Sequence, residues 1–253
     1  MRIRYRLILT VSFFAALTSN VGAIDLSEGQ QILERIDISM SFENTDFASV
    51  MTMISEDPEK GVEKRVIQQY RRDSENKFLM LFVEPVTQRG QGYLMIDDNL
   101  WFYDPESRKF SHTSLKEQFA ESDANNSDFR ESSIASDYRV AAVSEDTLGK
   151  FAVYVLDLEA TNSEVTYPNE RIWVTKDTSL VLKTEDSSAN GRLMRTSYFP
   201  NYAKVGDKYM PTKMIFVDNL IQGRKTQITV TDISTDPLPD SLFTKSYVER
   251  VNR

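Results

Sequence analysis

The sequence predicts a mainly β protein built on one large, curved antiparallel sheet whose inner face wraps helices or a cavity. Apolar residues recur with a period of about two along most of the chain, and clusters of turn-forming residues separate these segments. Several of the predicted strands are apolar on both sides, so both of their faces need cover. A β-sandwich is the alternative, because periodicity alone does not distinguish one curved sheet from two packed sheets.

The first 23 residues have the three-part layout of a secretory signal peptide. Arg2, Arg4 and Arg6 precede an apolar run at 7–17, and small residues follow at 21–23. The run is shorter than the roughly 20 residues that a membrane-spanning helix needs. We therefore predict a signal peptide over 1–23 and a mature protein that begins near Ile24, outside the cytoplasm. An uncleaved N-terminal anchor is the alternative.

Composition restricts the chemistry of the mature chain. It has no Cys, so core packing must stabilise it without disulfides, and thiol catalysis and cysteine metal sites are excluded. Its net charge is −8, and removal of the three leader arginines makes it about −11. An acidic surface disfavours nucleic acid and anionic membranes as partners.

A helix is expected at the start of the mature chain. Ser27 is the predicted cap, with Gln30 at capping-box spacing, and Ile32, Leu33 and Ile36 share one face. Strands are expected to follow at 47–54, 62–72, 78–83, 93–96, 100–103, 151–158, 171–175, 180–185, 192–199, 213–217 and 226–233. The polar stretch 113–137 predicts short helices and loops that interrupt the sheet.

Signatures of catalysis are weak. The sequence has no G-x-S-x-G, no phosphate-binding glycine loop, no H-E-x-x-H and no calcium loop, so no enzyme activity, cofactor or metal is predicted. His112, the only imidazole, lies at a polar strand end and is expected to be exposed. The carboxylate pairs Asp97-Asp98 and Glu185-Asp186 are both expected at turns. Methionines recur near the strands, and composition alone favours ordinary core filling over an apolar ligand site.

The stretch Asp98-Asn99-Leu100-Trp101-Phe102-Tyr103-Asp104-Pro105 resembles the LolA-like periplasmic lipoprotein carriers. More specifically, the chain is similar to the outer membrane lipoprotein-sorting branch. The further motifs, in order, are Gly90-Gln91-Gly92, Ser127-Asp128-Phe129, Trp173-Val174, Pro211-Thr212-Lys213-Met214, Gly223-Arg224-Lys225-Thr226 and the stretch 239–244. Asn125-Asn126 replaces the usual Met-Gly, and 117–123 is acidic, so ligand choice can differ from that of the family.

The resemblance implies an incomplete, strongly curved barrel closed by helices around a hydrophobic cavity, formed by a single domain over 24–253. It also implies a periplasmic, non-enzymatic carrier that binds lipid or lipoprotein acyl chains and moves them towards the outer membrane. An inner-membrane transporter and an outer-membrane acceptor are the implied partners. A lipid-sensing or accessory subunit of a resistance-nodulation-division (RND) transporter is one alternative, and an envelope hydrolase using His112 is the other. The predicted cavity residues are Met80, Phe82, Leu94, Ile96, Trp101, Tyr103, Tyr154, Leu156, Trp173 and Met214.

Overall fold

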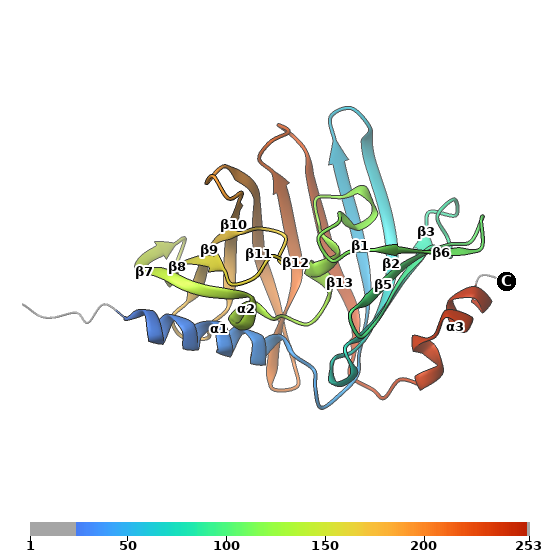
Figure 1. Ribbon diagram of the computed structural model, residues 1–253, viewed down its shortest axis with the longest axis horizontal. Helices are drawn as coiled ribbons and strands as arrows, with labels where there is room; N and C mark the ends of the chain where they lie inside the picture. Colours follow the sequence, from blue (N-terminus) through green and yellow to red (C-terminus); the bar gives the residue numbers. More distant parts are fainter. Residues whose placement is uncertain (1–23, 252–253) are drawn as a thin grey trace, which may run out of the picture.

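The computed structural model describes residues 24–251, and its 13 strands form one antiparallel sheet (Figure 1). The strands are β1 (Phe47–Asp57), β2 (Gly61–Arg72), β3 (Lys77–Glu84), β4 (Gly92–Ile96), β5 (Asn99–Asp104), β6 (Lys109–Thr113), β7 (Tyr138–Leu148), β8 (Phe151–Ala160), β9 (Asn169–Thr175), β10 (Val181–Ser187), β11 (Leu193–Val205), β12 (Lys208–Asp218) and β13 (Lys225–Ser234). The predicted signal peptide lies outside the described residues.

The strand order is β6-β5-β4-β3-β2-β1-β13-β12-β11-β10-β9-β8-β7. Every pair of neighbouring strands in the sheet is consecutive in sequence except β1 and β13, which pair in its middle. Strands β6 and β7 form the two free edges, so the sheet is not closed. This confirms the predicted open, barrel-like sheet and rules out the sandwich alternative.

Helices are few and short beside this sheet. They are α1 (Leu26–Met40), α2 (Ile134–Asp137) and α3 (Lys245–Arg250), with 3-10 turns η1 (Asp73–Glu75), η2 (Phe119–Glu121), η3 (Asn126–Phe129) and η4 (Asp240–Phe243). The 3-10 turns η2 and η3 and the short helix α2 confirm the predicted short helices and loops over 113–137. Among the described residues, no helix combines the length and apolar character needed to cross a membrane.

Helix α1 confirms the predicted apolar face but not the predicted cap. Its N-cap is Asp25, whose carboxylate accepts a hydrogen bond from the backbone N–H of Glu28 at 2.8 Å. Ser27 is the second residue of the helix, within its first turn, and Asp25 supplies the acceptor that this turn needs. Ile32, Leu33 and Ile36 are buried against the sheet as predicted.

Helix α1 and the segment 114–137 cover one side of the sheet, which we call the inner face (Figure 1). Under α1, Leu156 and Ile172 form one core cluster. Under 114–137, Phe119 and Phe129 pack on the apolar side chains of β1–β5, β12 and β13. The inner face therefore carries two adjoining apolar regions, each beneath a different cover.

The opposite, outer face is covered over β3–β5 by the C-terminal segment with η4 and α3. Leu242, Phe243 and Val248 pack there against Leu79 and Leu81 of β3. The alternate residues of β3 belong to the inner-face core. This explains why the 78–83 run is continuously apolar: both of its faces are buried.

Candidate functional site

An apolar cavity lies between the C-terminal half of α1 and strands β9–β12, and we call it the inner cavity. Its volume is about 210 Å³. Segment 127–134 contributes the remaining wall. The apolar side chains that line it are Ile36, Met40, Ile134, Ile172, Leu180, Val181, Phe199, Tyr202, Tyr209, Pro211, Met214 and Phe216. The cavity can therefore hold part of a flexible apolar ligand.

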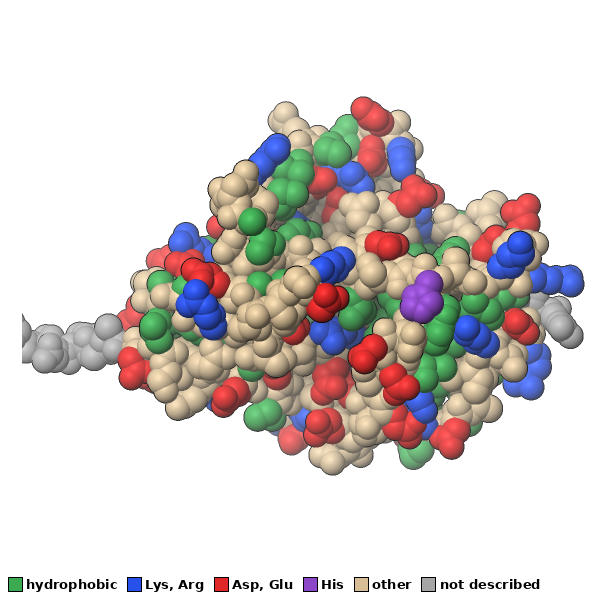
Figure 2. Space-filling view, in the orientation of Figure 1, with side chains coloured by type: hydrophobic (Ala, Val, Ile, Leu, Met, Phe, Trp, Pro, Cys, Tyr) green, Lys and Arg blue, Asp and Glu red, His purple; other side chains and the backbone are tan. Residues whose placement is uncertain are grey.

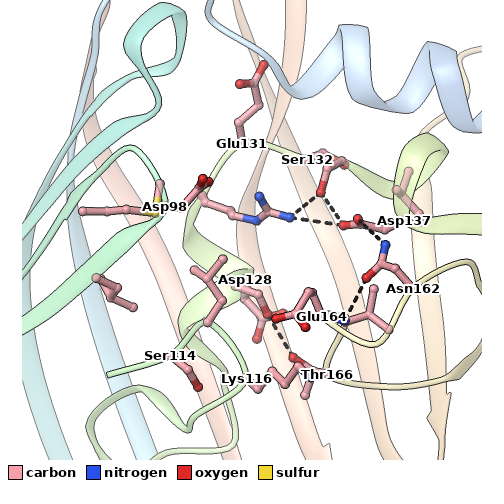
Figure 3. Close-up of a pocket in the computed structure, with 18 of the residues that line it drawn as sticks. Asp98, Ser114, Lys116, Asp128, Glu131, Ser132, Asp137, Asn162, Glu164 and Thr166 are labelled. Carbon is pink, nitrogen blue, oxygen red and sulfur yellow. Dashed lines mark hydrogen bonds and ion pairs between the residues drawn. The ribbon is translucent and has the colours of Figure 1, made fainter. Parts of the chain in front are cut away.

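A larger polar pocket of about 890 Å³ opens beside the inner cavity, next to strands β4–β6. Figure 3 shows charged and hydroxyl side chains around it, among them Asp98, Lys116, Glu131 and Glu164. Of its cations, Arg130 is paired with Asp137 at 3.1 Å, and Lys116 donates to the backbone carbonyl of Ser163. The pocket offers polar contacts and a predominantly acidic lining.

Segment 127–134 separates the two spaces, because several of its residues line both of them. Asp37 of α1 holds one end of this segment. Its carboxylate accepts hydrogen bonds from the backbone N–H groups of Ile134 at 3.0 Å and Ala135 at 2.9 Å, and from the Ser132 hydroxyl at 2.5 Å. The partition is thus tied to α1 rather than only to the sheet.

Arg195 on β11 holds the other end of the partition. Its guanidinium donates to both carboxylate oxygens of Asp128 at 2.6 and 3.1 Å, and to Asp186 on the neighbouring strand at 2.7 Å. It also donates to the backbone carbonyl of Asp123 at 3.3 Å. Arg195 and Asp186 are buried. One buried cation, which lines both spaces, is therefore paired with two carboxylates.

Glu170 on β9 completes this polar wall. It accepts a hydrogen bond from the Tyr138 hydroxyl at 2.8 Å. Burial, together with the negative charge of Asp186, raises the pKa of Glu170 to about 8, and burial also raises the pKa of Asp186. Glu170 is therefore largely protonated at neutral pH.

The expectation that Glu185-Asp186 lies at a turn was wrong: both residues are inside β10, and Asp186 pairs with Arg195. The Asp97-Asp98 turn is confirmed between β4 and β5. His112 is exposed on edge strand β6, as expected, with its ring 5.5 Å from that of Trp101. It is the only histidine in the chain and the purple side chain of Figure 2.

The ten predicted cavity residues divide between the two faces of the sheet. Five lie on the inner face: Met80, Phe82, Tyr154, Leu156 and Met214. Of these, Met214 lines the inner cavity, while the other four belong to the inner-face core clusters under α1 and the 114–137 segment.

The other five predicted residues lie on the outer face, so they do not line the two spaces described above. Leu94, Ile96 and Tyr103 pack with η4 and α3, Trp101 lies 3.9 Å from the ammonium group of Lys245, and Trp173 packs with Val153 and Val155. The cause is the alternation of side chains along a strand. A strand covered on both faces does not reveal which parity faces the cavity.

Several lining residues escaped the sequence reasoning. Ile36 was predicted only to share one face of the helix, and Phe199 was predicted only as the last residue of a strand. Arg195 gave no local signal, because its partner Asp128 is 67 positions away. The Ser127-Asp128-Phe129 motif lies in the segment that separates the two spaces, but the sequence did not indicate that Asp128 pairs with Arg195.

Comparisons with known proteins agree with this architecture. A protein-family model with the description "Uncharacterized protein"-like matches residues 74–250, which are most of the chain. The chain therefore belongs to that family. No curated protein matches the sequence. The structure is similar to that of a LolA superfamily protein from Nitrosomonas europaea, with 26% identity and a TM-score of 0.74 over 86% of this chain and 98% of that one.

Two further solved structures share the fold. One is a domain assigned to the outer membrane lipoprotein-sorting proteins, from Vibrio parahaemolyticus (21% identity, TM-score 0.79, 89% of this chain and 100% of that one). The other is a DUF1329 family protein from Desulfovibrio piger (23% identity, TM-score 0.78, 88% and 98%). The open sheet, with α1 across an apolar cavity, defines a binding fold of the carrier type. The chain belongs to the LolA-like superfamily, as its motifs indicated.

Proposed function

We propose that the chain is a periplasmic, non-enzymatic carrier that binds acyl chains of lipids or lipoproteins in the inner cavity and moves them towards the outer membrane. The observation that carries this proposal is the apolar cavity between α1 and β9–β12 in a chain of the LolA-like superfamily. Export by the predicted signal peptide at 1–23 is part of the proposal, as are a transporter that donates the cargo and an outer-membrane acceptor.

Burial of apolar surface gives such a site its affinity. Each buried methylene contributes about 0.8 kcal/mol, so about eight methylenes contribute about 6 kcal/mol, which corresponds to a Kd of tens of micromolar. The inner cavity of about 210 Å³ is smaller than most ligand pockets. Displacement of segment 127–134 would join it to the polar pocket and accommodate a longer chain.

The test is binding of the fluorescent apolar probe N-phenylnaphthylamine to the purified mature protein, followed by displacement with a diacylated phospholipid. Val181→Trp fills the inner cavity and should weaken probe binding at least tenfold. Leu182→Trp is the matched control, because Leu182 is the next residue on β10 and packs on the outer face with Val153 and Trp173. Equal binding by the two variants, or no binding by the wild-type protein, would refute the proposal.

A further inference from the structure

The floor of the inner cavity carries one buried hydroxyl without a hydrogen-bond partner. Ser197 lies on β11 between Thr184 of β10 and Phe216 of β12, and its side chain is 1% exposed. Within residues 24–251, four buried side-chain oxygens have no hydrogen-bond partner, and Ser197 Oγ is the one whose residue lines the inner cavity. Such a group is costly to leave unpaired and usually marks a missing partner.

The surroundings of Ser197 restrict which ligand group can be that partner. Asp128, Glu170 and Asp186 also line the inner cavity. Arg195 donates to Asp128, Asp186 and the Asp123 carbonyl, and Arg130 donates to Ser133 and Asp137, so both cations of the wall are already engaged. A ligand carboxylate would meet the carboxyl groups of Asp128 and Asp186, whose cation Arg195 is already shared between them.

A neutral carbonyl oxygen suits this site better. It accepts a hydrogen bond from the serine hydroxyl and brings no charge into the apolar cavity, where an unpaired charge is strongly disfavoured. Apolar side chains also line the cavity on these strands, with Phe199 on the same strand and Met214 on the next. The site therefore places a hydroxyl donor beside apolar side chains, which match the carbonyl group and the chain of an acyl ester or amide.

We propose that Ser197 is a specificity-determining residue: its hydroxyl donates a hydrogen bond to the carbonyl oxygen of a neutral acyl ester or amide, whose chain lies against Phe199, Tyr202 and Met214. The carboxylates around it discriminate against free fatty acids. This inference deepens the proposed acyl-chain binding and rests on it.

The test compares three competitors of one chain length, dodecane, methyl dodecanoate and dodecanoate, in displacement of N-phenylnaphthylamine at pH 7.5. The wild-type protein should bind methyl dodecanoate about tenfold or more tighter than dodecanoate. Ser197→Ala should weaken methyl dodecanoate binding about three- to tenfold relative to dodecane, the range expected for one neutral hydrogen bond. Ser197→Thr keeps a hydroxyl and should retain the preference.

Ser49→Ala is the control, since Ser49 is a buried serine of β1 that lines neither space and whose hydroxyl already donates to Oε1 of Gln69 at 3.3 Å. It should leave the ratio of ester to alkane affinity unchanged. The inference is overturned if Ser197→Ala leaves that ratio at the wild-type value, or if dodecanoate binds as tightly as its ester. If none of the apolar probes binds the wild-type protein, the proposed function itself fails.

Discussion

Glu170 should make the protein less stable as the pH rises, and Glu170→Gln should remove this effect. The carboxyl has a pKa raised to about 8 by burial and by Asp186. In the unfolded chain it ionises near pH 4.3. Between these values the native state holds a proton that the unfolded state has released. The stabilisation that comes from this proton is therefore fully present below about pH 4, and it is lost as the pH rises through 8.

The size of the effect follows from this window. Full linkage gives about 1.4 kcal/mol per pH unit, or a ceiling of about 5 kcal/mol. Glu170 is only partly buried, at the edge of both spaces, and its ionisation is shared with Asp186, so we expect about 2 kcal/mol. Glutamine keeps the oxygen that accepts the hydrogen bond from Tyr138 but carries no charge.

Urea unfolding at several pH values between 5 and 9 measures the prediction. At pH 5 the variant and the wild type should agree within about 0.5 kcal/mol, and at pH 8.5 the variant should be more stable by about 2 kcal/mol. Glu159→Gln, at an exposed ion pair with Arg139 on β7 and β8, should not change the slope. Parallel pH profiles of Glu170→Gln and the wild type would refute the reasoning.

Three further outcomes are expected. His112→Ala should leave carrier function in cells unchanged and alter stability by no more than about 0.5 kcal/mol, because the side chain is exposed on an edge strand; loss of function with an unchanged Tm would favour an enzyme instead. Phe243→Ala should cost about 3–5 kcal/mol in urea unfolding while probe affinity stays unchanged, because Phe243 is buried on the outer face; weakened binding by the folded variant would place the ligand there. N-terminal sequencing of the periplasmic protein should begin near Ile24, and an intact Met1 on membrane-bound protein would contradict export.

Local sequence patterns predicted most of the sheet. The alternation along β2 and the Asp97-Asp98 turn each placed an element within a few residues of its observed bounds. Strand β7 was not predicted because its C-terminal half is exposed and polar. Helix α3 was not predicted because it is a short helix that tertiary contacts stabilise. Such elements depend on neighbours that are distant in sequence.

The site was less predictable than the sheet, for two physical reasons. When a strand is apolar on both faces, its sequence does not show which alternate side chains point to the inner face. Leu94 and Met80 therefore could not be distinguished from sequence, although Leu94 lies on the outer face and Met80 on the inner face. The polar wall depends on the pairing of Arg195 with Asp186 and Asp128. The pairing with Asp186 spans one hairpin, and the other joins the sheet to the 114–137 segment.

The central claim is that acyl chains bind between α1 and the inner face of the sheet. Photolabelling tests it most directly: a methyl ester of a fatty acid with a diazirine in its chain is bound, activated by light and located by peptide mass spectrometry. We predict labels on 36–40 of α1 and on 199–216 of β11 and β12, suppressed by Val181→Trp. Labels confined to 94–103 and 242–248, on the outer face, would contradict the account.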